Sequence, residues 1–408
     1  MAKQLKILQI ANKPPYPPMD GGAIGMNNVT HELISVGHDV KVLAVNTHKH
    51  FVDIKNLPAS YIADTHIEFG FIDTRIKPFA AALNLFGKRS YNIVRFYDEN
   101  FASRLSELLR QNNYDIVIVD SVFLKDYLPL IRKISQAKVV LRAPNVEFKI
   151  WERLAETETN IIKKWYLKVL ARRLKKEELG VINDFDGFFT VTQNDLNILR
   201  DSGADVPATF IPTGLDVTKE SEMSNVEEEE VSLFHIGALD WMPNQEGIQW
   251  FLENVWEEVS KKNPELKFYI AGRRPTDELM KIRKKNVEIL GEVEDAGAFI
   301  RKHSIMVVPL FSGSGMRVKI IEGMMLGRAI VSTSMGAEGI ITQPGEDIII
   351  ADTPQEFIRG INLLVNDLEK LRSVQKNAVI QCKKHYSEDA LAGKLNEFLR
   401  KITSGHKS

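Results

Sequence analysis

The amino-acid sequence predicts an α/β protein with two doubly wound, Rossmann-like domains. Its 408 residues are more than one hydrophobic core usually serves. Short apolar runs alternate with helical segments, which is typical of parallel sheets covered by helices. A polar, acidic stretch at 216–230 separates two such series and is typical of a linker or insertion. We therefore expect one domain at 1–215 and another at 231–387.

The first domain contains six apolar segments of strand length. They lie at 5–11, 39–46, 66–72, 114–121, 137–144 and 185–192. The intervals include segments of helical composition, such as 25–36 and 92–112. Because parallel strands end at the same edge of a sheet, we expect ligands to bind at the carboxyl ends of these strands.

The second domain repeats this pattern. Its strand-like segments lie at 231–238, 266–272, 287–293, 304–310, 329–334 and 347–352. A long helix is expected at 244–263, and the last helix of the chain at about 388–402. The same rule about ligand position applies to this second sheet.

Composition excludes several classes of protein. The chain has 53 basic and 54 acidic residues, so its net charge of −1 gives no general affinity for nucleic acid. Cys382 is the only cysteine, which excludes an internal disulfide and a thiolate metal cage. Lys6 and Gln9 interrupt the first apolar run, unlike the core of a signal peptide, and no run reaches the roughly 18 apolar residues of a membrane span. We expect a soluble cytoplasmic protein.

Glycine-containing turns follow the first predicted strand of each domain. Gly21 and Gly22 precede the helix predicted at 25–36, without the G-x-G-x-x-G pattern of dinucleotide-binding folds. Backbone at such a position can approach a ligand, although the turn could equally be a simple connection. In the second domain, Gly237 is followed by Asn244, which either contacts a ligand or caps the next helix.

A third turn has the sequence PLFSGSGMRVKIIE and follows the strand predicted at 304–310. In it, Ser314 precedes Arg317, Lys319 and Glu322. A turn between a strand and a helix directs backbone N–H groups and the positive end of the helix dipole at a phosphate. The alternative is a tight turn with two solvated basic residues.

Several segments, in their order along the chain, resemble the retaining glycosyltransferases of family 4. The likeness is to bacterial sugar transferases whose donor loop has the form G-S-G-x-R-x-K-x-x-E, here GSGMRVKIIE. The other matching segments are FHIGALDWMPN (234–244), YIAGRRP (269–275), LGEVED (290–295), VSTSMGAEGI (331–340), PPMDGG (17–22), LRAPNVE (141–147) and IPTGLD (211–216). The resemblance implies a GT-B fold, in which two Rossmann-like domains face a central cleft. It also implies an acceptor domain first, a donor domain second, and a last helix, 388–408, packed back on the first domain.

The resemblance further implies transfer of a sugar from a nucleotide-sugar to a glycan or lipid-linked acceptor, with retention of configuration. Glu322 would accept hydrogen bonds from ribose hydroxyls, while Arg317 and Lys319 would neutralise the diphosphate. The donor-binding candidates are Gly21, Gly22, Gly237, Asn244, Arg273, Ser314, Gly315, Arg317, Lys319 and Glu322; the acceptor-side candidates are Arg142, Asn145 and Glu147. We expect no cofactor and no metal, since the nucleotide-sugar is a substrate and the basic loop can neutralise its phosphates.

Two positions depart from the family pattern. Ser314 stands where the family commonly has a first glutamate, and Pro144 where related enzymes have a histidine. Two alternatives therefore stay open: a catalytically silent GT-B module that binds a nucleotide-sugar or a partner transferase, and a GT-B-fold nucleotide-sugar epimerase. The sequence DFD at 184–186 resembles a metal-binding D-x-D motif, but it opens a predicted strand and lies far from the phosphate loop.

One helical segment of the first domain, 163–176, carries seven basic residues and no acidic one. Its apolar side chains are Trp165, Tyr166, Leu167, Leu170 and Leu174. A second apolar and basic stretch lies at 79–91. Together they indicate a possible resting place on an anionic membrane surface, and the alternative is an ordinary helix with solvated charges.

Overall fold

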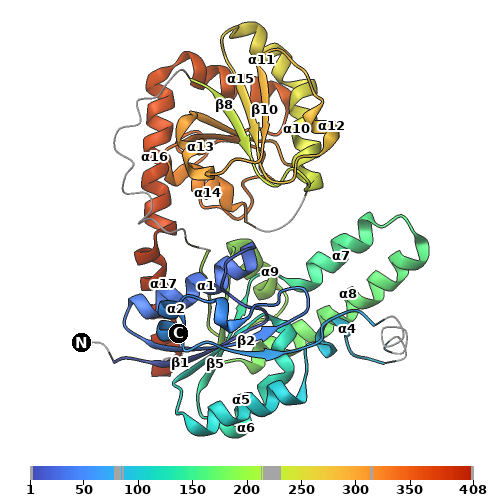
Figure 1. Cartoon of the computed structure of the whole chain (residues 1–408), viewed down its shortest axis with the longest axis vertical. Coiled ribbons are helices and arrows are strands. Elements are labelled where there is room, and N and C mark those ends of the chain that lie inside the picture. Colours follow the sequence, from blue (N-terminus) through green and yellow to red (C-terminus); the bar gives the residue numbers. More distant parts are fainter. Residues whose placement is uncertain are drawn as a thin grey trace. The chain divides into compact units, whose positions relative to one another are not determined.

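The computed structural model describes residues 3–77, 84, 87–212, 214, 231–312 and 316–405. Contacts divide the chain into two compact units, one of Met1–Gly214 with Leu391–Ser408 and the other of Leu215–Ala390. Each unit contains one parallel sheet with helices on both faces (Figure 1). The acidic stretch at 216–230 lies outside the described residues.

The first unit is built on a seven-stranded parallel sheet with the order β3-β2-β1-β4-β5-β6-β7. Its strands are β1 (Lys6–Ala11), β2 (Asp39–Asn46), β3 (Glu68–Phe71), β4 (Ile116–Asp120), β5 (Lys138–Ala143), β6 (Gly187–Thr190) and β7 (Ala208–Phe210). Each predicted strand segment contains one of them. The sequence missed β7, because three half-buried residues are too short a run to show strand periodicity.

The helices of this unit are α1 (Gly21–Ser35), α2 (Ala59–Thr65), α4 (Tyr91–Val94), α5 (Glu99–Gln111), α6 (Leu128–Ile134), α7 (Glu147–Thr157), α8 (Ile161–Val181), α9 (Gln193–Asp201) and α17 (Glu388–Ser404). The helix predicted at 92–112 is two helices. Asp98 separates them, since its side chain accepts hydrogen bonds from the N–H groups of Asn100 and Phe101 and so starts α5.

Opposite faces of the first sheet enter two cores. Along β1, Leu8 and Ile10 point into one core, while Ile7 and Ala11 point into the other, as expected for alternating side chains. Helices α5, α6 and α8 contribute to the first core, and α1, α2 and α17 to the second (Figure 1). The last helix therefore completes the first unit, although it follows the second unit in the sequence.

The second unit has a six-stranded parallel sheet with the order β10-β9-β8-β11-β12-β13. Its strands are β8 (Leu233–Ile236), β9 (Phe268–Ala271), β10 (Val287–Gly291), β11 (Ile305–Val308), β12 (Ala329–Ser332) and β13 (Ile349–Ile350). All lie within the segments predicted from the sequence. The strand order reverses between β8 and β11, which is where open α/β sheets usually bind ligands.

The helices of the second unit are α10 (Met242–Asn254), α11 (Trp256–Lys262), α12 (Asp277–Met280), α13 (Ala296–Lys302), α14 (Val318–Met325), α15 (Pro354–Asn366) and α16 (Leu368–Tyr386). The single helix predicted at 244–263 is broken at Val255, whose φ of −124° is not helical. Side chains of α10, α11 and α15 pack on one face of the sheet, and those of α13 and α14 on the other. Helix α16 contributes to both cores, with Leu371 and Val374 in the first and Ala378 and Cys382 in the second. Within the described part of the chain, no helix is both long and apolar enough to cross a membrane.

Candidate functional site

The reversal of strand order in the second sheet brings two predicted turns together. Gly237 directly follows β8, and Lys319 lies in the first turn of α14, which follows β11. A Cβ atom on Gly237 would lie 2.8 Å from Nδ2 of Asn244 and 3.2 Å from Nζ of Lys319. Three candidates that are far apart in the sequence, Gly237, Asn244 and Lys319, are therefore in contact, and glycine is needed at 237 for space.

The Lys319 ammonium is held by two side-chain acceptors. Its Nζ donates to Oδ1 of Asn244 at 2.9 Å and lies 3.3 Å from Nε2 of His235. His235 is buried, and its Nδ1 is 2.9 Å from the carbonyl oxygen of Val307, an interaction that requires a proton on Nδ1. In the neutral ring Nε2 is then an acceptor, so this tautomer suits Lys319.

Burial changes the protonation of both Lys319 and His235. It lowers the pKa of Lys319 to about 7, and the charge of Arg317 acts in the same direction. Burial also lowers the pKa of His235 well below its usual range, so the ring is neutral. The site thus keeps a lysine poised between its charged and neutral forms at neutral pH, beside a neutral histidine.

Asn244 does not cap the helix that surrounds it. Helix α10 starts at Met242, and Asn244 lies inside its first turn. The Nδ2 group of Asn244 donates to the carbonyl oxygen of Ala238 at 2.8 Å, which leaves Oδ1 to accept from Lys319. The capping alternative considered from the sequence is therefore wrong, because the side chain ties the β8 turn to α14 instead.

Arg317 stands at the start of α14, in the N-cap position. Its side chain is buried, and its guanidinium lies 5.6 Å from the centre of the Trp241 ring, within range of a cation–π contact. The first turn of α14 carries no acidic residue, so the positive end of the helix dipole is not offset there. Ser314 and Gly315, the two remaining candidates of this turn, lie outside the described residues.

Glu322 lies one turn further along α14 and is half-buried. Burial raises the pKa of its carboxyl group. Among the residues that the structure describes, none donates a hydrogen bond to this carboxylate. A carboxylate in such a setting is stabilised by any hydroxyl groups that can donate to it.

The turn after β9 packs directly on the turn after β8. Gly272 has a φ of +152°, and a Cβ atom there would lie 1.6 Å from the carbonyl oxygen of Gly237. The next residue, Arg273, accepts a hydrogen bond from the N–H of Leu239 through its carbonyl oxygen and exposes its side chain. Arg273 therefore projects from the same edge of the sheet as Gly237, while Arg274 pairs with Asp240 at 3.3 Å.

In the first unit, Gly21 and Gly22 form the first turn of α1 instead of preceding the helix as expected. The reason is Asp20, whose carboxylate accepts from the N–H of Ala23 and starts the helix earlier. Asp20 also pairs with Lys13, and a Cβ atom on Gly22 would lie 2.8 Å from the Lys13 ammonium. The turn after β1 thus places an ion pair beside Gly22.

Arg142 lies in a buried polar network at the carboxyl ends of the central strands. Its Nη1 is 3.3 Å from Oδ1 of Asp120, and only 3% of Arg142 is exposed. The other carboxylate oxygen of Asp120 accepts from Gln9 at 2.8 Å, and Gln9 accepts from Thr30 at 2.6 Å. The pair links β4 to β5, and sequence reasoning missed Asp120 because no motif marks it.

Glu147 forms a buried carboxylate pair with Glu178 of α8, a residue that sequence reasoning also missed. Glu178 accepts from the N–H groups of Glu147 and Phe148 at 3.1 and 2.9 Å, so it caps the start of α7. Burial raises the pKa of Glu147 to about 7, and a hydrogen bond from the half-buried Asn145 opposes this. Burial and the charge of Glu147 raise the pKa of Glu178 to about 8.

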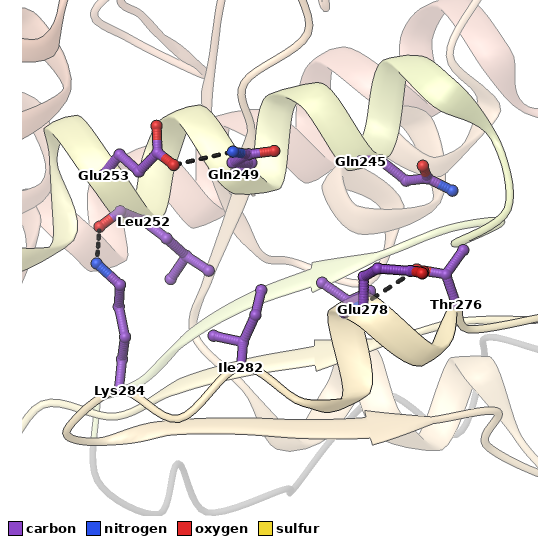
Figure 2. Close-up of a pocket in the computed structure, with 9 residues that line it drawn as sticks. Gln245, Gln249, Leu252, Glu253, Thr276, Glu278, Ile282 and Lys284 are labelled. Carbon is purple, nitrogen blue, oxygen red and sulfur yellow. Dashed lines mark hydrogen bonds between the residues drawn. The ribbon is translucent and has the colours of Figure 1, made fainter.

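Two other features are not connected with these residues. In DFD, the Asp186 carboxylate accepts from the N–H of Val139 and pairs with Arg132, both at 2.7 Å, so it holds β5 and α6 in place. Figure 2 shows a pocket of about 360 Å³ between α10 and the segment 276–284, lined in part by Gln245 and Lys284. These two side chains are hydrogen-bonded to the carbonyl groups of Leu239 and Leu252. Of the predicted site residues that the structure describes, none lines this pocket.

Comparison with known proteins points to one class of enzyme. Residues 230–367 match the family model described as glycosyl transferases group 1. Over 394 residues the chain is 23% identical to an uncharacterized 44.6 kDa protein in the cps region of Klebsiella pneumoniae, which covers 93% of this chain and 96% of that protein.

Three solved structures share the fold over nearly the whole chain. HepE from Anabaena, in complex with UDP, is 12% identical with a TM-score of 0.62 and covers 97% of this chain and 100% of its own. Sucrose-phosphate synthase from Thermosynechococcus elongatus is 12% identical, with a TM-score of 0.67 and coverage of 99% and 100%. A glycosyltransferase from Rickettsia africae is 14% identical, with a TM-score of 0.65 and the same coverage. The GT-B fold predicted from the sequence is confirmed, and the group 1 domain supports a glycosyltransferase.

Proposed function

We propose that this protein transfers a sugar from a nucleotide-sugar to a glycan or lipid-linked acceptor, with retention of configuration and without a metal ion. The observation that carries the proposal is the group formed by Gly237, Asn244 and Lys319 at the reversal of strand order in the second sheet. The group 1 domain over 230–367 supports it. So do the solved complexes of Anabaena HepE with UDP and with UDP-glucose, whose fold this chain shares.

In this proposal the diphosphate binds over the start of α14. Lys319 and Arg317 supply positive charge, and the first N–H groups of α14 add donors along the helix dipole. Both cations are partly or fully buried, which strengthens their interaction with an anion relative to exposed residues. The same groups would stabilise the charge that develops on the leaving diphosphate in the transition state.

The chemistry requires one bond to break and one to form at the anomeric carbon. The bond from this carbon to the diphosphate oxygen breaks, and a bond to the acceptor oxygen forms on the same face of the sugar. The acceptor proton passes to an oxygen of the leaving diphosphate, so no side chain has to serve as the base. This route fits a site whose two residues assigned to the diphosphate, Arg317 and Lys319, are cations, and it leaves Ser314 and Pro144 compatible with activity.

Glu322 provides the sharpest test, because the proposal gives it one specific task. If its carboxylate accepts from the ribose hydroxyls, Glu322→Ala should weaken UDP binding by about 1.5–3 kcal/mol. In wild type, 2′,3′-dideoxy-UDP should bind more weakly than UDP, and in Glu322→Ala the two ligands should bind alike. Calorimetric titration of the four combinations measures this coupling.

A second experiment identifies the donor. Nucleoside diphosphates and nucleotide-sugars are screened for thermal stabilisation of the protein, and those that stabilise it are then assayed for turnover. A ligand at 100 times its dissociation constant raises the free energy of unfolding by about 2.7 kcal/mol. Turnover in EDTA is expected to equal turnover in manganese. Stabilisation without any turnover would favour the silent module, and absence of stabilisation by every nucleotide would overturn the proposal.

A further inference from the structure

Helices α7 and α8 form an antiparallel hairpin whose turn, 158–160, lies away from the strands of the first unit (Figure 1). Three large apolar side chains are exposed where α8 begins. Ile161 is 83% exposed, Ile162 79% and Trp165 57%. Burying side chains of this size elsewhere in the protein stabilises it, so their exposure at one place indicates a surface that meets something apolar.

The same face of α8 continues as a row of cations. Ile161, Trp165, Lys168, Arg172 and Lys176 follow spacings of three and four residues and therefore share one side of the helix. The three basic side chains are exposed, and among the described residues none pairs with them. At 1.5 Å per residue, the face from Ile161 at its apolar end to Lys176 at its basic end is roughly 22 Å long.

The opposite side of α8 faces the protein. Leu170 and Leu174 are buried, and Leu174 belongs to the core that α5 and α6 also cover. These residues therefore cannot contact an outside surface. The sequence had suggested that they could, as part of the apolar side of 163–176, and in this respect the prediction was wrong. Arg173 is also engaged, since it donates to the carbonyl oxygen of Asn84 at 2.8 Å. Most of the second predicted stretch, 79–91, lies outside the described residues.

We infer that this face of α8 docks on an anionic lipid bilayer, with Ile161, Ile162 and Trp165 entering the interface and Lys168, Arg172 and Lys176 meeting the headgroups. An apolar end combined with a row of cations matches a surface that is apolar below and negatively charged above. Tryptophan in particular is favoured at the boundary between headgroups and hydrocarbon. Docking does not depend on glycosyl transfer, so the two can fail separately.

Two other occupants fit less well. A second copy of the chain would bring the same row of cations toward itself in a two-fold interface, and like charges repel. Three side chains also cover much less than the roughly 800 Å² per partner of a standard protein interface. A nucleic acid would pair with Lys168, Arg172 and Lys176 but would leave two isoleucines in water.

The test compares the full chain with two variants of α8 in sedimentation with vesicles. One variant is Ile161→Ser with Ile162→Ser and Trp165→Ser, and the other is Lys168→Gln with Arg172→Gln and Lys176→Gln. The matched control on α16 is Lys376→Gln with Ile380→Ser, Lys383→Gln and Lys384→Gln, which removes three exposed lysines and one exposed isoleucine from the second unit.

Wild type and the α16 control should bind vesicles that contain phosphatidylglycerol, and each α8 variant should lose at least about tenfold in partitioning. Binding to phosphatidylcholine alone should be weak, and added salt should release the protein. Trp165→Phe should remove most of the tryptophan quenching caused by brominated lipid. Equal partitioning of wild type and both α8 variants would overturn the inference.

The same variants separate the other occupants. Concentration-dependent self-association that only the α8 variants abolish would favour a second copy of the chain. Binding to single-stranded DNA that is lost in the lysine and arginine variant but kept in the apolar variant would favour nucleic acid. UDP affinity should stay unchanged in both variants, so a failure of docking is distinct from a failure of donor binding.

Discussion

Lys319 lies between two neutral acceptors, Asn244 and His235, and burial lowers its pKa to about 7. An anionic diphosphate favours the charged form of the lysine and so raises its pKa in the complex. We expect UDP binding at pH 8 to take up protons, and the affinity to fall as pH rises above 7. Lys319→Met should abolish this proton uptake while keeping a side chain of similar length.

Calorimetry in buffers of different ionisation enthalpy measures the number of protons bound. UDP titrates as well, so the informative quantity is the difference between wild type and Lys319→Met at each pH. Identical proton uptake in both proteins would mean that Lys319 does not meet the diphosphate.

At the scale of the element, the turns after β8 and β9 depend on each other. Gly272 has a positive φ, and a Cβ atom there would lie 1.6 Å from the Gly237 carbonyl oxygen. Gly272→Ala should therefore lower the free energy of unfolding by about 2–5 kcal/mol, through backbone strain and overpacking. Gly393→Ala is the control, since Gly393 lies in α17 with no atom within 4 Å of the new Cβ atom. That change should stabilise the protein by about 0.5–1 kcal/mol. Denaturant unfolding compares the two, and a stable Gly272→Ala protein would show that the turns can move apart.

The start of α7 should respond to pH through Glu178. Its pKa is about 8 in the folded protein, above the usual value near 4.5, so the folded state binds more protons than the unfolded state between these values. Stability from this group is full below the unfolded pKa and is lost as pH rises through 8. Glu147 acts in the same direction.

Glu178→Gln removes the titration and keeps an oxygen that can accept from the N–H groups of α7. As pH rises from 5 to 8.5, wild type should therefore lose stability relative to Glu178→Gln. The melting temperature of the variant minus that of wild type should increase across this range, which the raised pKa defines. Parallel melting curves for both proteins across this range would contradict the expected linkage.

Strands were more predictable than the ends of helices, for a physical reason. The strands of parallel sheets are buried on both faces, so each appears as a continuous apolar run, and only the short β7 escaped notice. The ends of helices depend on single hydrogen bonds, such as those of Asp20 and Asp98, which composition does not reveal.

Site residues that lie in one segment of the chain could be predicted from the sequence. Partners that come from distant segments could not. Arg317, Lys319 and Glu322 lie in one short segment of the chain, so the sequence placed them together. His235 was not considered, because its contact with Lys319 spans 84 residues. Glu178 was missed for the same reason, since 31 residues separate it from Glu147. Side-chain partners across a sheet or a hairpin are fixed by the packing, which one sequence does not show.

At the scale of the whole molecule, each unit has its own cores, and α17 belongs to those of the first. Leu395→Ala should lower the free energy of unfolding of the first unit by about 2–5 kcal/mol, because Leu395 is fully buried there. Hydrogen exchange should then speed up in β1 and β5, while β8 and β11 keep their protection. Lys401→Ala, an exposed change on the same helix, is the control. Loss of protection in both sheets would show that the units unfold together.

The place of α17 also bears on how the chain folds as it leaves the ribosome. All six strands of the second sheet, which ends with β13 at Ile350, are synthesised before Leu391, whereas the first sheet, although synthesised earlier, must wait for its last covering helix. Until then Phe189, whose ring centre lies 6.2 Å from that of Phe398 in α17, lacks part of its cover. The order of completion is thus the reverse of the order of synthesis. A product that stops within the second unit would carry an uncovered apolar face, the kind of surface that chaperones and proteases recognise.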